Sequence, residues 1–232
     1  MADLTNVDVF VPTDVLEARR DFFLFFSGVQ GTGVTDIQKG GKMLRQDDVP
    51  KLNARTGVRL VRVGWFGSIR NVRGIDEAFN LVTLGNQYVP GDSRLVIYGH
   101  SAGAANALDL CRRFDKHNQR ITTRRSAPND DGSGHTVQVD LLVTVDAAAQ
   151  EKTNQLDRSV AKCVARNLNF WQDNIWSVNG AAARLFDWSR GAPNVGSARI
   201  ENIEVPGATH KTIDGMTWDR AVNEMQQTLS RT

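Results

Sequence analysis

The chain has few cysteines, little excess charge and no long hydrophobic run. Its two cysteines, Cys111 and Cys163, lie in segments with helical patterning, and their spacing fits no metal motif. We therefore expect two small buried thiols in a reducing compartment and no metal site. A formal net charge of +2 is too small to indicate nucleic acid or an acidic membrane as a partner. No run of about 18 apolar residues is present, so no transmembrane segment is expected.

The first eight residues carry acids where a secretory signal peptide would carry basic residues, and no apolar run follows at once. This makes a cytoplasmic location the default expectation, with export by a signal-independent route left open. A length of 232 residues fits one domain with a full core, spanning 1–232. The sequence does not report an oligomeric state.

Apolar runs typical of strands alternate with segments of helical spacing. The expected strands are 7–11, 21–26, 58–66, 95–98, 137–146 and 198–205, and the expected helical segments begin at 72, 104 and 218. Residues 118–134 are polar and are typical of an exposed loop or ragged hairpin. This alternation predicts an α/β fold, in which a mostly parallel central sheet is flanked by helices on both faces.

The most informative motif is Gly99-His100-Ser101-Ala102-Gly103, between the expected strand at 95–98 and an alanine-rich helical segment. A strand–turn–helix context of this kind is required for a nucleophile elbow, which presents a serine hydroxyl at the top of a sheet. Gly99 and Gly103 leave room for the neighbouring backbone. The alternative is a glycine-flanked serine that only caps a helix, which would not explain the second glycine.

Candidate reactive residues follow several of the expected strands. The loop from Ser27 to Gly33, Ser101, Asp146 and His210 each come directly after one. In parallel sheets, reactive groups collect beyond the carboxyl ends of the strands, so we expect these four to share one edge.

A serine hydroxyl becomes a good nucleophile when a base, usually histidine, removes its proton. His210 is the preferred base because it follows the last strand on a Pro-Gly loop. His100 is expected to point away from Ser101, His117 to be a structural residue near a helix end, and His135 to be a reserve candidate. The alternative for His210 is an unpartnered histidine on a surface loop.

The imidazole needs a carboxylate to hold its tautomer and to stabilise the imidazolium. Asp146 is the preferred acid because it ends a strongly apolar strand at the expected edge; its alternative is a helix N-cap. Asp187 and Asp173 are rivals, and Asp214 lies too close in sequence to His210 to be preferred.

An oxyanion hole needs backbone N–H donors near the serine. The glycine-rich loop after the strand at 21–26 supplies Val29 or Gln30 as one donor, and Ala102, at a helix start, supplies the other. The same loop could suggest a phosphate site, but neither the dinucleotide glycine spacing nor a Gly-Lys-Ser/Thr sequence is present.

With these residues in place, the chain resembles an α/β-hydrolase over about 21–210, because serine, acid and histidine follow in that family's order. By this resemblance Ser101 is the nucleophile, Asp146 the acid and His210 the base, with Val29 or Gln30 and Ala102 as oxyanion donors. The resemblance implies hydrolysis of carboxylic esters, including lipid or acyl esters, through an acyl-enzyme. It implies no metal or organic cofactor.

Two features depart from the family's usual pattern. Ser27-Gly28 replaces the common His-Gly, and the acid follows the first strand after the elbow strand, whereas most members place it one strand later and some lipases use the earlier position. We therefore interpret 147–197 as helical, with aromatic residues such as Trp176 and Trp188 that line an acyl cleft, form a partial lid or pack helices onto the sheet. Otherwise the cap is expected to be small or absent. The alternative functions are a thioesterase or acyltransferase on the same triad, or a non-catalytic binding module of this fold.

Overall fold

The computed structural model describes residues 7–10, 21–26, 59–63, 72–84, 88–125, 134–148, 156–173, 191–210 and 212–230. Its central element is a seven-stranded sheet in the order β1-β3-β2-β4-β5-β7-β9. The strands of this sheet are β1 (Val7–Phe10), β2 (Phe22–Phe26), β3 (Arg59–Val63), β4 (Leu95–His100), β5 (Leu141–Val145), β7 (Arg166–Trp171) and β9 (Arg199–Glu204). Neighbouring strands are parallel except that β1 is antiparallel to β3.

The strands at the middle of the sheet are those with the most apolar sequences. β2 is an unbroken run of Phe and Leu and lies between β3 and β4, so its five side chains are all buried. β4 and β5 are buried along their whole length as well. A strand with a layer of helices over both faces needs apolar side chains on both, which explains these runs.

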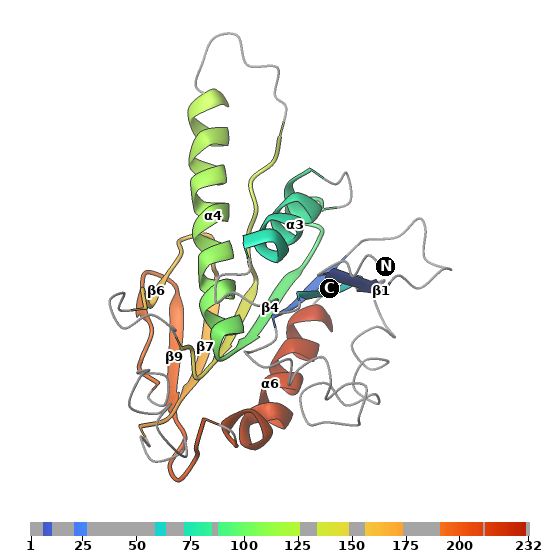
Figure 1. Ribbon diagram of the computed structural model, residues 1–232. Helices are drawn as coiled ribbons and strands as arrows, with labels where there is room; N and C mark the ends of the chain where they lie inside the picture. Colours follow the sequence, from blue (N-terminus) through green and yellow to red (C-terminus); the bar gives the residue numbers. More distant parts are fainter. Residues whose placement is uncertain are drawn as a thin grey trace.

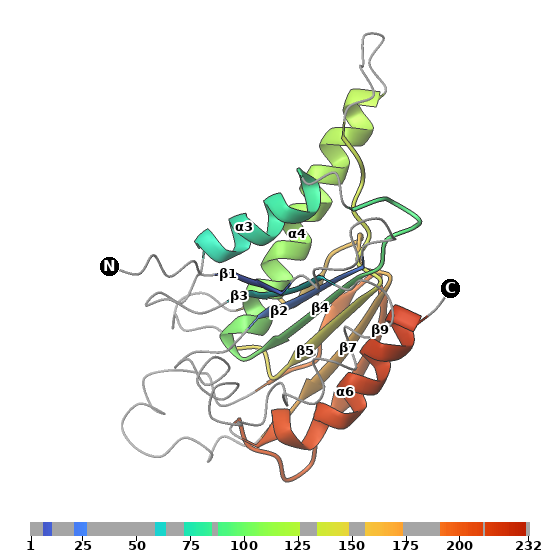
Figure 2. The same cartoon turned by 90° about the vertical axis from the view of Figure 1, so that its right-hand side faces the viewer.

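Helices cover the two faces of the sheet (Figures 1 and 2). On one face lie α3 (Val72–Thr83) and α4 (Ala102–Arg125), which pack together through residues such as Ile75, Leu108 and Phe114. On the other face lies α6 (Ile213–Ser230), whose Trp218 and Met225 are fully buried against β4 and β5. The predicted α/β class, with a mostly parallel sheet covered on both faces, is confirmed.

The prediction that 147–197 is helical and lacks a strand is wrong. β7 lies within this segment and extends the main sheet, and β6 (Ser159–Val160) pairs with β8 (Val195–Gly196) in a second, two-stranded sheet. β7 was missed because Asn167 and Asn169 interrupt its apolar pattern, and asparagine is disfavoured in strands. Both amides are fully buried and hydrogen-bonded, so the strand tolerates them.

The predicted loop at 118–134 is also partly wrong, because α4 continues to Arg125. Ile121 is buried, and the hydroxyls of Thr122 and Thr123 donate back to the carbonyls of Asn118 and Gln119 on the preceding turn. These local bonds let threonine residues stay in a helix although their propensity is low.

Cys111 and Cys163 are buried free thiols, as expected, and burial raises the pKa of each thiol well above its ordinary value. None of the helices among the described residues is both long enough and apolar enough to cross a bilayer.

Candidate active site

Ser101 occupies a strained turn between β4 and α4. Its φ is +56°, a left-handed conformation that is uncommon for a residue with a side chain. Its N–H donates to the carbonyl of Val145 at 2.9 Å, and its carbonyl accepts from the N–H of Ala104 at 3.0 Å and of Ala148 at 3.2 Å. The turn is therefore bonded both to the first turn of α4 and to the loop that follows β5.

Gly99 is required by the close approach of α4 to the end of β4. A Cβ at this position would lie 2.6 Å from both the Cα of Ala104 and the carbonyl oxygen of Gly103. Because the colliding atoms are backbone, a larger residue at 99 would displace the helix itself. This is the local geometry expected of an elbow that turns from a strand directly into a helix.

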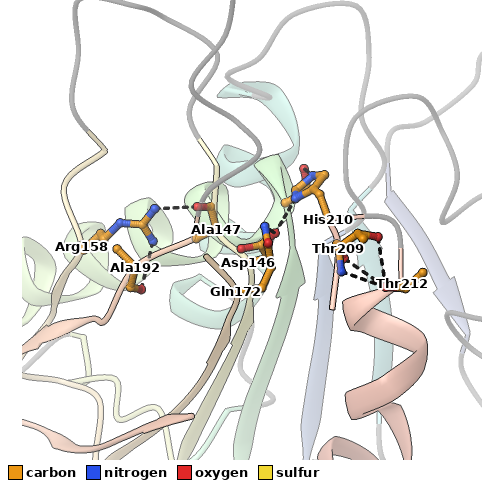
Figure 3. Close-up of polar contacts among 9 residues, drawn as sticks. Asp146, Ala147, Arg158, Gln172, Ala192, Thr209, His210 and Thr212 are labelled. Carbon is orange, nitrogen blue, oxygen red and sulfur yellow. Dashed lines mark hydrogen bonds and ion pairs between the residues drawn. The ribbon is translucent and has the colours of Figure 1, made fainter. Parts of the chain in front are cut away.

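Ser101, His210 and Asp146 are joined by a continuous chain of hydrogen bonds. The Nε2 atom of His210 lies 2.8 Å from Ser101 Oγ. On the other side of the ring, Nδ1 of His210 lies 2.6 Å from Asp146 Oδ2 (Figure 3). Ser101 and Asp146 are buried, and the His210 side chain is 13% exposed. An ionised carboxylate accepts only, so the proton lies on Nδ1 and Nε2 is left to accept the serine hydroxyl proton.

Parallel strands bring these groups together. Ser101 directly follows β4, Asp146 directly follows β5, and His210 lies on the loop after β9. Since β4, β5, β7 and β9 run parallel, their carboxyl ends meet at one edge of the sheet.

The carboxylate of Asp146 has two donors on one oxygen. Its Oδ2 accepts from Gln172 Nε2 at 3.0 Å as well as from His210 Nδ1. Its Oδ1 is buried and has no hydrogen-bond partner among the described residues. The backbone at Asp146 also adopts a positive φ of +45°, held by its N–H donating to the Phe170 carbonyl at 2.7 Å.

Gly191 packs against the other side of this carboxylate. A Cβ on Gly191 would collide with Asp146 Oδ1 and would lie 3.0 Å from Trp171 Cβ. The N–H of Gly191 donates to the Gln172 carbonyl at 2.9 Å, which ties this segment to the end of β7.

A network of asparagine side chains holds the segment from Gly191 to Asn194 on the sheet. The Nδ2 atom of Asn194 donates to Thr144 Oγ1 at 2.9 Å and to Asn167 Oδ1 at 3.0 Å. The N–H of Asn194 donates to Asn202 Oδ1 at 2.8 Å. Asn167 and Asn194 are buried, and a buried amide is tolerated where it finds partners, so these contacts explain how a polar residue can occupy β7.

Arg158 makes a second connection near the site. Its guanidinium donates to the carbonyls of Ala147, at 2.8 Å, and Ala192, at 3.4 Å (Figure 3). Arg158 therefore links Ala147, which follows Asp146, to Ala192, which follows Gly191.

His100 lies against His210. Its ring stacks on that of His210, with centroids 5.3 Å apart and planes inclined by 28°. Both ring nitrogens of His100 are buried. Burial, and to a smaller extent the neighbouring His210 ring, lowers the pKa of His100 to about 3. His100 is therefore neutral at any ordinary pH and adds no charge beside His210.

His100 should make folding stability sensitive to acid. Unfolding restores its pKa to about 6.5, so between these two values the unfolded chain binds a proton that the folded chain does not. Lowering the pH from 7 to 5 should therefore cost about 2 kcal/mol of folding free energy through this group alone. In His100→Phe, which keeps a ring but cannot titrate, this part of the loss should vanish from urea-unfolding curves measured across pH. An unchanged pH slope in the variant would contradict the assignment.

The other two histidines lie elsewhere. The Nε2 atom of His117 contacts the carbonyl of His135 at 2.9 Å, and the Nε2 atom of His135 contacts the carbonyl of Val82 at 3.0 Å. His117 lies inside α4 rather than at its end, so the helix-end argument for it is wrong. Both rings link backbone segments, and the structure does not bring the reserve candidate His135 to Ser101.

Several predicted residues lie outside the described part of the chain. These are Val29 and Gln30 among the oxyanion donors, and Asp187 among the rival acids. Ala102 is described and opens α4, so its N–H has no acceptor within the helix. Trp176 and Trp188 are outside as well, whereas Phe170 is buried in the core beneath α6 and so packs the helix onto the sheet.

Gln172 and Gly191 were not anticipated from the sequence. Gln172 directly follows β7. Asp146 was predicted because residues that follow parallel strands share one edge of the sheet, and the same argument applies to Gln172 once β7 is known to be a strand. No pattern in the sequence indicates Gly191, because its place beside Asp146 depends on the amide network.

No protein-family model matches the chain, and no curated protein does either. Among solved structures, the chain is similar to the esterase domain of a Rhodothermus marinus protein, with 14% identity and a TM-score of 0.44, over 96% of this chain and 92% of that one. It is also similar to EstE1, a thermostable carboxylesterase cloned from a metagenomic library, with 10% identity and a TM-score of 0.49, over 97% and 85%. A third is FphF, a fluorophosphonate-binding serine hydrolase of Staphylococcus aureus, with 11% identity and a TM-score of 0.47, over 95% and 91%.

Proposed function

We propose that this chain, an α/β-hydrolase by its fold, is a serine hydrolase that cleaves carboxylic esters through an acyl-enzyme. The observation that carries the proposal is the unbroken hydrogen-bond chain from Ser101 through His210 to Asp146. In this proposal Ser101 is the nucleophile, His210 the general base and acid, and Asp146 the carboxylate that orients the imidazole.

The first half of the reaction forms the acyl-enzyme. As Ser101 Oγ attacks the ester carbonyl carbon, its proton passes to Nε2 of His210, 2.8 Å away. The tetrahedral intermediate carries its negative charge on the former carbonyl oxygen, near the N–H of Ala102 at the start of α4. Val29 or Gln30 is the proposed second donor. The imidazolium then gives its proton to the departing alcohol as the carbon–oxygen bond breaks.

The second half releases the acid. Water attacks the acyl carbon while His210 accepts its proton, and that proton returns to Ser101 Oγ when the carboxylic acid leaves. The imidazolium in both halves lies against Asp146, a fully buried carboxylate 2.6 Å from Nδ1, where the low local polarity strengthens the ion pair. The neutral ring of His100 on the other side fills space without opposing the positive charge.

The substrate we propose is a small-molecule or lipid ester rather than a peptide, since nothing in the sequence predicts a charged specificity pocket. Hydrolysis of nitrophenyl esters with short to long acyl chains should separate a preference for small esters from one for lipid esters. Comparing an ester with a thioester of the same acyl chain tests thioesterase activity. Adding an alcohol acceptor tests acyl transfer.

A fluorophosphonate probe tests whether the serine is activated. We expect the probe to label the wild type at Ser101, found by mass spectrometry of the modified peptide, because the phosphonate is attacked by a serine whose proton a base removes. Ser93 is also buried, so labelling there would indicate non-specific reaction. Absence of labelling at Ser101 in the folded protein would favour the non-catalytic binding module.

A further inference from the structure

Gln172 is placed where it can act on the proposed acid. It follows β7 directly, is 1% exposed, and sends its side-chain Nε2 to Asp146 Oδ2 at 3.0 Å. Figure 3 shows the Gln172 side chain beside the Asp146 carboxylate, with His210 next to it.

The contact converges on the oxygen that faces the imidazole. His210 Nδ1 and Gln172 Nε2 both approach Oδ2. Oδ1 is buried with no hydrogen-bond partner among the described residues, and Gly191 packs so close to it that an added Cβ would collide with it. A carboxylate can rotate about its Cβ–Cγ bond, and His210 alone would fix only one contact. A second donor on the same oxygen, with close packing on the other, leaves one orientation in which Oδ2 faces Nδ1.

The side chain is not needed to hold the backbone at the end of β7. The Gln172 carbonyl accepts from the N–H of Gly191, and the Trp171 carbonyl accepts from the N–H of Val205 at 2.9 Å. Both bonds would exist with any residue at 172. What an amide adds here is a neutral donor that reaches a buried carboxylate and brings no charge to it.

We propose that Gln172 is a positioning residue that fixes the Asp146 carboxylate and moderates how strongly it holds the His210 proton. Its effect on the rate rests on the proposed function. A donor on Oδ2 withdraws part of the negative charge that would otherwise act on the imidazolium. Without it, His210 should bind its proton more tightly and should release it only at higher pH.

Other titratable groups lie near His210 and could change the pH at which it releases its proton. From β4, His100 stacks on the ring and is neutral, because burial holds its pKa at about 3. From the end of β5, Asp146 contacts Nδ1. On α6, the buried Asp214 faces Tyr98. Asp173, next to Gln172, is exposed and therefore screened by solvent.

The test compares Gln172→Leu, which removes the donor, with Gln172→Glu, which places a second carboxyl group at the same point. We expect kcat for a nitrophenyl ester to fall about tenfold in Gln172→Leu with KM unchanged, as befits loss of one hydrogen bond to a charged group. The acid limb of the kcat/KM profile should move to higher pH in Gln172→Leu, and further in Gln172→Glu. Gln119→Leu, at an exposed position of α4, is the matched control and should leave both kcat and the acid limb of the kcat/KM profile unchanged.

An NMR titration of the His210 ring provides a readout that does not need activity. Its midpoint should move to higher pH in the same order as the acid limb. If the wild type hydrolyses no ester but the midpoints still move, the proposed function fails and the coupling through Gln172 stands. If both folded variants titrate as the wild type does, the proposal is overturned. Should Gln172→Leu fail to fold, the near-isosteric Gln172→Glu provides the test: a His210 titration midpoint equal to that of the wild type would overturn the proposal.

Discussion

Replacing Ser101 by alanine is expected to lower kcat for nitrophenyl esters by about 10⁴-fold or more, without a comparable change in KM. The loss should be large because in the proposed mechanism the serine hydroxyl oxygen is the attacking atom, and neither His210 nor Asp146 can supply another in its place. Steady-state hydrolysis of the preferred acyl chain length by the wild type and the variant measures the ratio.

The variant should stay folded, which makes the comparison clean. The elbow is held by backbone bonds from Ser101 to Val145, Ala104 and Ala148, and alanine keeps all three. A thermal melt near that of the wild type is the control. Equal activity in both proteins would mean that the esterase signal comes from a contaminant or another residue.

Asp146→Asn is expected to lower kcat by about 10⁴-fold as well, although it changes one oxygen to nitrogen. The asparagine NH₂ would donate to Nδ1 of His210, which forces the imidazole proton onto Nε2. That nitrogen then cannot accept the proton of Ser101 Oγ. The effect is large because the imidazole is held in the wrong tautomer, and not only because a charge is lost. Pre-steady-state measurement should show the fall in the acylation rate of the variant.

Two matched variants separate Asp146 from its sequence rivals. Asp173→Asn changes an exposed carboxyl next to Gln172, and Asp187→Asn changes the rival outside the described residues. Asp173→Asn should keep kcat within about twofold of the wild type, as substitutions of exposed residues usually do. We expect the same of Asp187→Asn, because Asp187 has no part in the proposed triad. A large loss in Asp187→Asn with little in Asp146→Asn would transfer the acid role to Asp187.

The parts of this molecule that the sequence predicts well are those dictated by simple periodicity. The apolar runs at β2 and β4 are typical of strands buried on both faces, and a parallel sheet then brings residues that follow such strands to one edge. That reasoning is enough to group Ser101, Asp146 and His210. Their roles in catalysis stay predictions until the variants are measured.

What the sequence hides depends on partners far along the chain. In β7 the buried Asn167 donates to the Leu142 carbonyl and the buried Asn169 donates to Asn202 Oδ1. The sequence of that segment by itself shows only that two asparagine residues, which are disfavoured in strands, interrupt its apolar residues. The contact from Gln172 to Asp146 cannot be predicted from the sequence for the same reason, because Gln172 can be placed beside Asp146 only when β7 is known to be a strand. Propensity is overridden here by tertiary hydrogen bonding.

The shared oxygen of Asp146 has a consequence for how such sites diverge. Because Gln172 Nε2 and His210 Nδ1 meet on the same atom, Asp146 Oδ2, the side chains that follow two neighbouring strands, β5 and β7, lie in contact beside the imidazole. A lineage that acquires glutamate at 172 would for a time carry both carboxyl groups, and could then lose the older one. The acid would have passed from one strand end to the next in two substitutions, with the nucleophile and base undisturbed.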